Sequence, residues 1–127
     1  MFHASMKFGL PEEIEALREM VHRFAQDRVA PRAAEIDAAN AFPPELWPEM
    51  GALGLLGVTV PEEYGGSDLG YLTFGVVLEE LGRQLTASPL LASALVGTSA
   101  ILQGGSDDQK QTYLPKLVDG SEVLTLA

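Results

Sequence analysis

The apolar positions near the start of the sequence recur every three or four residues, which is the period of an amphipathic helix. They are Leu10, Ile14, Leu17, Val21 and Phe24. Pro11 and the acidic residues after it suit the first turn of this helix, because proline has no amide to lose there and acids favour the positive end of the helix dipole. Pro31 predicts a kink or a break, and a second helical piece follows over residues 33–39.

The next part of the chain is less regular. A short helix is expected over residues 45–53. Three glycines in and after it permit close approach of backbones: Gly51, Gly54 and Gly57. Val58 and Val60 are expected to be extended, and a turn-rich loop follows over residues 61–66.

Two segments in the second half are apolar around most of their circumference, which is typical of buried helices. The first covers residues 71–85, and the second begins at Ser88-Pro89 and reaches about residue 102. Two buried helices in so short a chain imply a compact bundle. A last helix opens at Ser106, where Ser-Asp-Asp-Gln has the form of a capping box, and Asp119-Gly120 turns the chain into a final strand.

The predicted fold is therefore all-α: a helical bundle of about six helices, followed by one terminal strand over residues 122–127. These last residues alternate like a strand, but no later segment could pair with them. An isolated strand exposes unpaired amides and carbonyls, so we expect this one to join a further domain. The expected organisation is a flexible tail over residues 1–9, a helical domain over residues 10–121, and the first strand of a missing middle β domain over residues 122–127.

Composition and charge limit which partners the protein is expected to bind and in which compartment of the cell it is expected to lie. The net charge is −10, with 18 acidic and 8 basic residues, which opposes binding of nucleic acid. The chain has no cysteine, which excludes disulfides and thiolate metal sites and fits a reducing cytoplasm. The longest apolar stretch, residues 89–102, is shorter than the roughly 20 residues that cross a bilayer. We therefore expect a cytoplasmic protein that binds neither nucleic acid nor membrane.

The titratable residues do not form a complete catalytic arrangement in the sequence. Adjacent glutamates occur at Glu12–Glu13, Glu62–Glu63 and Glu79–Glu80. Neighbours on a helix point about 100° apart, so such pairs do not converge on one substrate. We expect Glu79 and Glu80 to pair with Arg83 on a solvated helix face. His3 and His22 lie far apart without spaced ligands, so no metal site is expected, and no residue here is assigned as catalytic.

Four stretches occur in an order that is typical of one protein family. They read EALREMVHRFAQDRVAPRAAEID, FPPELWPEMGALGLLGVTVPEEYGG, VVLEELGR and GSDDQKQTYLPKLVDGSEVLTLA. The second is similar to the pattern F-P-x-E-x-W…G-L-L-G…P-E-E-Y-G-G, and the last to G-(S/N)-x-x-Q-K-x-x-Y-L-P-x-L-x-x-G. From about Leu10 to Ala127, the sequence resembles the acyl-CoA dehydrogenase family.

The resemblance implies a fold, an activity and a cofactor. Members have an N-terminal all-α domain, a middle β-barrel domain and a C-terminal four-helix bundle, and SEVLTLA looks like the first strand of that barrel. The implied reaction is FAD-dependent α,β-dehydrogenation of an acyl-CoA thioester to the 2-enoyl-CoA: a glutamate removes the α-proton, and the β-hydride goes to the flavin. In most members that glutamate lies in the C-terminal domain, so the isolated 127-residue chain is expected to be inactive.

The resemblance also implies site residues. Leu126 and Ala127 fall where the strand of the family begins its contacts with the flavin. The helix over residues 89–102 resembles the one that floors the acyl pocket. On one face of it lie the expected substrate-binding residues, Ala92, Leu95, Val96 and Ser99.

Several side chains of this helix are small, which would leave volume for a ligand. They are Ala92, Ser93, Gly97 and Ser99. The alternative is that this face simply packs in the core. Expected partners are an acyl-CoA substrate, an electron-transfer flavoprotein or similar acceptor, and the other subunits of a homo- or hetero-tetramer.

Other interpretations remain open. One is a related flavin enzyme, such as an acyl-CoA oxidase or a flavin monooxygenase, and another is a stand-alone, non-catalytic helical interaction module. Fast reaction of the reduced flavin with oxygen would indicate the first, and absence of bound flavin the second. The stretch ELGRQLTASPLLASALV looks like a bacterial branch that includes heteromeric enzymes acting on bulky acyl groups, in which one subunit can lack the catalytic base.

Overall fold

The computed structural model describes residues 9–127, and the tail expected over residues 1–9 lies outside this part except for Gly9. The first helix, α1, spans Glu12–Phe24 and begins directly after Pro11, with three acidic residues in its first turn. Its buried side chains are Ile14, Val21 and Phe24. The predicted amphipathic helix is therefore confirmed, with its apolar stripe turned inward.

A break around Pro31 joins α1 to α2. The chain first widens into a π-helical turn over Ala25–Val29 and then tightens into a 3₁₀ turn over Ala30–Arg32. Proline has no amide and its ring crowds the carbonyl four residues earlier, so a regular α-helix cannot pass through it unchanged. Helix α2 then covers Ala33–Ala39 and ends at Asn40, whose φ of 50° is left-handed. The predicted interruption and the predicted second helix are both confirmed.

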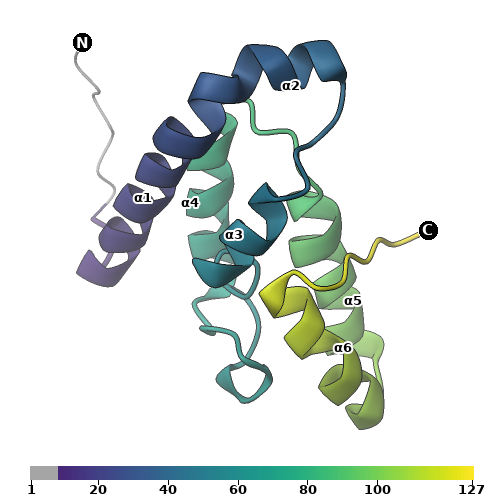
Figure 1. The fold of residues 1–127 in the computed structure, drawn as a ribbon. Helices are drawn as coiled ribbons and strands as arrows, with labels where there is room; N and C mark the ends of the chain where they lie inside the picture. The colour runs from purple at the N-terminus through teal and green to yellow at the C-terminus, as the bar shows by residue number, and fades with distance from the viewer. Residues whose placement is uncertain (1–8) are drawn as a thin grey trace.

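The remaining helices follow α2 along the chain, with α4 beside α1 and with α5 and α6 on the far side of the molecule (Figure 1). They are α3 (Leu46–Ala52), the 3₁₀ helix η3 (Glu62–Tyr64), α4 (Gly70–Gly82), the π-helix η4 (Leu90–Gly97), α5 (Thr98–Gly104) and α6 (Asp107–Asp119). Helix α4 lies along α1, while η4 and α5 form one helical run that packs against α6. The all-α fold class is confirmed.

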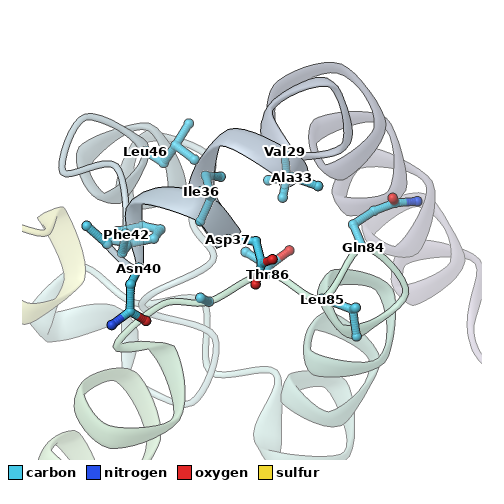
Figure 2. A pocket seen from close by; sticks show the side chains of 12 residues that line it. Val29, Ala33, Ile36, Asp37, Asn40, Phe42, Leu46, Gln84, Leu85 and Thr86 are labelled. Atoms are coloured by element: carbon cyan, nitrogen blue, oxygen red, sulfur yellow. The ribbon is translucent and has the colours of Figure 1, made fainter.

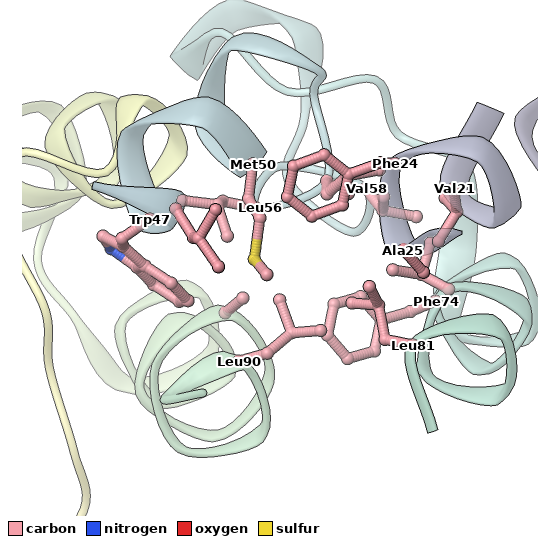
Figure 3. Close-up of a cluster of buried hydrophobic side chains, with 14 of the residues drawn as sticks. Val21, Phe24, Ala25, Trp47, Met50, Leu56, Val58, Phe74, Leu81 and Leu90 are labelled. Atoms are coloured by element: carbon pink, nitrogen blue, oxygen red, sulfur yellow. The ribbon is translucent and has the colours of Figure 1, made fainter. Parts of the chain in front are cut away.

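The main hydrophobic core lies where α1, α3, α4 and η4 meet (Figure 3). Phe24 comes from α1, Met50 from α3, Phe74 and Leu81 from α4, and Leu90 from η4. All five are buried, and Met50 is fully enclosed. Burying side chains of this size contributes about 1.5–3 kcal/mol each, so this cluster fixes how the four helices are arranged.

A second, smaller cluster lies under α6. Val60, Leu114 and Leu117 are buried there, and Leu124 packs on them from the C-terminal segment. Helix α6 approaches α3 so closely that a Cβ on Gly51 would lie 2.5 Å from the carbonyl oxygen of Asp119. The expectation of close backbone approach at Gly51 is therefore confirmed.

Two details differ from the sequence-based expectations. Val58 and Val60 are buried, but they lie in successive turns and are not extended. Helix α4 is not buried all round, because Leu72 is 72% exposed, and it ends at Gly82, three residues earlier than expected. Burial of α4 thus follows only the face that meets α1 and η4.

The C-terminal segment, residues 121–127, crosses the η4–α5 run without regular secondary structure (Figure 1). No β-strand occurs among the described residues. A strand needs a partner, and none of the described residues supplies one, so the strand over residues 122–127 stays a prediction. Among residues 9–127, no helix is long and apolar enough to cross a membrane.

Candidate functional site

A hollow of about 470 Å³ lies between the start of α4, the η4–α5 run and the C-terminal segment. We call it the Tyr71 hollow. It is lined by Tyr71, Leu95, Val96, Ser99, Ala100, Gln103 and Leu126. Three of the four residues expected to bind substrate therefore meet one of the two residues expected to contact the cofactor.

The other two expected site residues do not line this hollow. Ala92 lies on η4 and is half-buried, about one turn before Leu95 and Val96. Ala127 is exposed and follows Leu126 at the end of the described segment. The helical spacing placed Ala92 on the same face, but the hollow begins one turn further along.

Tyr71 is a lining residue that the sequence analysis counted with a buried apolar helix. Its side chain is 55% exposed, and its hydroxyl lies 3.1 Å from the hydroxyl of Ser99. The pair joins the first turn of α4 to α5 and gives the largely aliphatic hollow a polar end. The signal in the sequence is a hydroxyl on an aromatic residue at the start of an otherwise apolar helix, but its partner is 28 positions away.

The C-terminal segment is held against η4 by Leu124. The backbone N–H of Leu124 donates to the hydroxyl of Ser93 at 3.1 Å, and Ser93 is 1% exposed. A Cβ on Gly97 would lie 3.0 Å from the Cβ of Leu124. Of the small residues expected to leave room for a ligand, Ser93 and Gly97 instead make room for this segment.

The segment is also anchored where it leaves α6. The N–H of Ser121 donates to the Asp119 carboxylate at 2.7 Å, and the hydrogen bonds from Ser121 hold the pKa of that carboxyl below its usual range. The N–H of Glu122 donates to the carbonyl of Lys116 at 3.2 Å, and the side chains of Lys116 and Glu122 pair at 3.0 Å. The path of the chain toward the Tyr71 hollow is thus fixed at both ends of residues 121–124.

Beyond Leu124, the backbone groups of residues 125–127 make no hydrogen bond with any other described residue. Residues 125–127 are exposed, so their backbone amides and carbonyls are open to solvent or to a ligand. A flavin ring carries hydrogen-bond donors and acceptors along its polar edge, so these free groups beside Leu126 fit such a cofactor.

A group of charged residues lies away from this hollow, between α1 and α4. Arg83 pairs with both Glu79 and Glu80, as the spacing predicts. Arg18 of α1 also contacts both, with Nη1 at 2.9 Å from Glu80 Oε1, and His22 Nδ1 lies 3.3 Å from Glu80 Oε2. Glu80 is only 4% exposed, so the expectation of a wholly solvated face is wrong for this residue. The group fastens α1 to α4.

A second hollow, of about 420 Å³, lies between α2 and the loop after α4 (Figure 2). Ile36 and Phe42 line one side, and Gln84, Leu85 and Thr86 line the other. None of the six expected site residues lies in it. It is therefore separate from the candidate site at the Tyr71 hollow.

Comparison with known proteins agrees with the helical fold. The family model for the acyl-CoA dehydrogenase N-terminal domain matches residues 11–121. Mitochondrial isovaleryl-CoA dehydrogenase of Pongo abelii is 42% identical over 123 residues, which cover 94% of this chain and 29% of that protein.

Two solved structures are similar. One is a complex of glutaryl-CoA dehydrogenase with glutaryl-CoA, with 35% identity and a TM-score of 0.83, covering 93% of this chain and 31% of that one. The other is a glutaryl-CoA dehydrogenase from Mycobacterium smegmatis in complex with FADH2, with 25% identity and a TM-score of 0.83, covering 90% of this chain and 30% of that one. The chain thus spans less than a third of the length of these relatives. Because the family model covers nearly all of the described residues, this chain belongs to the acyl-CoA dehydrogenase family, whose N-terminal helical domain it forms.

Proposed function

We propose that this chain serves as the N-terminal domain of an FAD-dependent acyl-CoA dehydrogenase, and that the Tyr71 hollow receives part of the acyl chain beside the flavin. The observation that carries the proposal is the meeting of Leu95, Val96 and Ser99 with Leu126 in one hollow. The resemblance implied two functions for these residues, acyl binding and flavin contact. Both functions require neighbouring positions, because the oxidised carbons must lie against the flavin.

The chemistry of the hollow suits an acyl chain. Its volume, about 470 Å³, falls within the range of about 300–1,000 Å³ that is usual for small-ligand sites. Leu95, Val96 and Leu126 supply apolar walls, and Tyr71 with Ser99 supplies a polar end. The hollow is open to solvent in this domain, and such walls would help to keep water from the reacting part of a thioester bound between them and the flavin.

The cofactor enters at the C-terminal segment. When bound, FAD accepts a hydride from the β-carbon of the acyl chain. Leu126 and Ala127 would hold its ring through their free backbone groups, and Ser93 keeps Leu124, two residues before Leu126, in place. The proton-abstracting base lies outside this chain in the proposed arrangement.

The other expected properties remain proposals. The coenzyme A head group is anionic and this domain carries a net charge of −10, so we assign the binding of that group to other domains. An electron-transfer flavoprotein or similar acceptor is the proposed oxidant of the reduced flavin. A tetramer and a cytoplasmic location are proposed as well.

The test uses the full-length protein that carries this domain. We expect it to be purified with bound flavin, and we expect anaerobic addition of an acyl-CoA to bleach the flavin absorbance and yield the 2-enoyl-CoA. Rapid reoxidation by dissolved oxygen would favour an acyl-CoA oxidase or a flavin monooxygenase. A purified, folded protein that binds no flavin would contradict the proposal and favour an interaction module.

A further inference from the structure

Ser93 is a buried polar residue whose hydroxyl is not used by its own helix. Serine in a helix commonly bonds back to a carbonyl one turn earlier. Here the hydroxyl of Ser93 instead accepts the N–H of Leu124, 31 positions later in the chain. Its carbonyl accepts the hydroxyl of Thr98 at 2.9 Å, so the residue is held at two points. A buried hydroxyl held in this way has a fixed position from which to orient the segment it contacts.

Gly97 restricts the path of residues 121–127, because the absence of a side chain there lets the segment pass close to the helix. Gly97 lies four residues after Ser93, and residues at this spacing lie on one face of a helix. A Cβ at Gly97 would lie 3.0 Å from the Cβ and 3.1 Å from the carbonyl oxygen of Leu124. Ser93 and Gly97 thus form a seat that contacts Leu124 through one hydrogen bond and one close approach.

This seat sets the register of the residues that follow. Along the segment, Glu122 and Leu124 are half-buried, whereas Val123 and Thr125 are exposed. Leu126, two residues after Leu124, lines the Tyr71 hollow, although its side chain is 67% exposed. In an extended chain, a slip of one residue turns every side chain to the opposite side. A slip at Leu124 would therefore remove Leu126 from the hollow.

We infer that Ser93 and Gly97 are positioning residues that fix the register of residues 121–127 and thereby determine where Leu126 and Ala127 meet the flavin. The inference rests on the proposed function, because it takes these last residues as the flavin contact. Neither Ser93 nor Gly97 lines the Tyr71 hollow. They act on the cofactor only through Leu124.

The experiment compares Ser93→Ala and Gly97→Ala in the full-length protein. Ser93→Ala removes the acceptor of the Leu124 amide, so hydrogen exchange at that amide should become roughly three- to tenfold faster. Gly97→Ala keeps that acceptor but adds a methyl group where Leu124 packs. It also improves the helix propensity of η4, so any loss of function cannot come from a weaker helix. We expect both variants to raise the Kd of the apoprotein for FAD by about three- to tenfold and to shift the visible spectrum of the bound flavin.

The control is Ser106→Ala, which removes the serine cap of α6 and leaves the segment untouched. It should lower the melting temperature but leave the FAD affinity and the flavin spectrum as in the wild type. If Ser93→Ala and Gly97→Ala both bind FAD with wild-type affinity and spectrum, the inference is wrong, although the proposed function stands. A wild-type protein that takes up no FAD overturns the proposed function instead, whereas the exchange rate of the Leu124 amide still tests the role of Ser93 in the register.

Discussion

The hydroxyl groups of Tyr71 and Ser99 lie 3.1 Å apart, where the first turn of α4 faces α5 across the Tyr71 hollow. Neither residue is fully buried, so the pair can exchange hydrogen bonds with water when the hollow is empty. The apolar walls formed by Leu95 and Val96 lead up to this polar end. Tyr71 and Ser99 would therefore determine which lengths and polarities of acyl chain fit in the hollow.

Substitution Ser99→Leu should shorten the hollow. The larger side chain removes the hydrogen-bond partner of Tyr71 and occupies volume that a long acyl chain would need. We expect KM for the longest accepted acyl-CoA to rise on the order of tenfold, with a smaller change for the shortest, because loss of one or two methylene contacts is worth about 1–3 kcal/mol. Steady-state kinetics over a series of acyl-CoA lengths measures this effect.

A matched control for that experiment is Ala87→Leu. Ala87 lines the hollow beside α2 and is exposed, so the same kind of enlargement occurs away from the candidate site. Its KM values should equal those of the wild type at every chain length. An unchanged KM profile for Ser99→Leu would contradict the placement of the acyl chain in the Tyr71 hollow.

The buried carboxylate of Glu80 should contribute far more to the free energy of unfolding than the carboxylate of the neighbouring Glu79. Glu80 is 4% exposed and contacts Arg18, Arg83 and His22. Glu80→Gln leaves two guanidinium groups without this charge partner, and breaking a buried ion pair costs about 3–5 kcal/mol. Because both arginines are partly exposed, we expect a loss of about 2–3 kcal/mol in the free energy of unfolding, measured by denaturant titration.

Glu79 provides the comparison for this prediction. It contacts the same two arginines, but its side chain is 53% exposed. Glu79→Gln should change the free energy of unfolding by less than about 1 kcal/mol. Equal effects of the two substitutions would show that burial of Glu80 is not what gives this group its strength.

The charged residues between α1 and α4 also show how much of the structure the sequence could predict. The pairs of Glu79 and Glu80 with Arg83 follow from helical spacing and were expected. Arg18 lies more than 60 positions earlier, on a helix whose packing against α4 depends on the core between them. No pattern within either helix contains that contact, so the burial of Glu80 could not be predicted.

The candidate site likewise contains some residues whose placement the sequence predicted and others whose placement it could not predict. Leu95, Val96 and Ser99 were placed on one face by the helical period, and the structure brings them together in the hollow. Tyr71 and Leu124 belong to segments that reach η4–α5 only through tertiary packing. Their roles depend on the hydrogen bonds to Ser99 and Ser93, which join positions about 30 residues apart. Such contacts are invisible to periodicity, because periodicity describes one element at a time.

Leu85 should be a site where a substitution stabilises the domain. At the end of α4, the N–H of Leu85 donates to the carbonyl oxygen of Gly82, and the N–H of Thr86 donates to the carbonyl oxygen of Leu81. These two hydrogen bonds form the Schellman pattern of a helix C-terminus. Leu85 occupies the left-handed position of this motif, with φ of 51°, where glycine is preferred, and its side chain is 89% exposed. Leu85→Gly should raise the free energy of unfolding by about 1 kcal/mol, because the left-handed conformation costs a non-glycine residue about 1–2 kcal/mol.

The opposite result is expected for Leu72→Gly. Leu72 is also exposed, at 72%, but it lies within α4. Glycine there should lower the free energy of unfolding by about 1 kcal/mol through its poor helix propensity. If both substitutions destabilise the protein to the same extent, the strain at Leu85 is not significant.

A charge at Leu126 should weaken retention of the flavin. Leu126→Asp places a carboxylate among the apolar walls of the Tyr71 hollow, next to the free backbone groups that would hold the cofactor. Leu126 is 67% exposed in this domain, but a bound flavin would cover it, and a charge buried there without a partner would be strongly unfavourable, so either the segment moves away or the cofactor is lost. The ratio of flavin to protein absorbance after extensive dialysis of the full-length protein should fall well below that of the wild type. Val123→Asp is the control, because Val123 lies on the same segment but does not line the hollow, and this variant should keep its flavin. Equal retention in both variants would place the flavin away from Leu126 and would remove the structural reason for joining the acyl site and the cofactor site in one hollow.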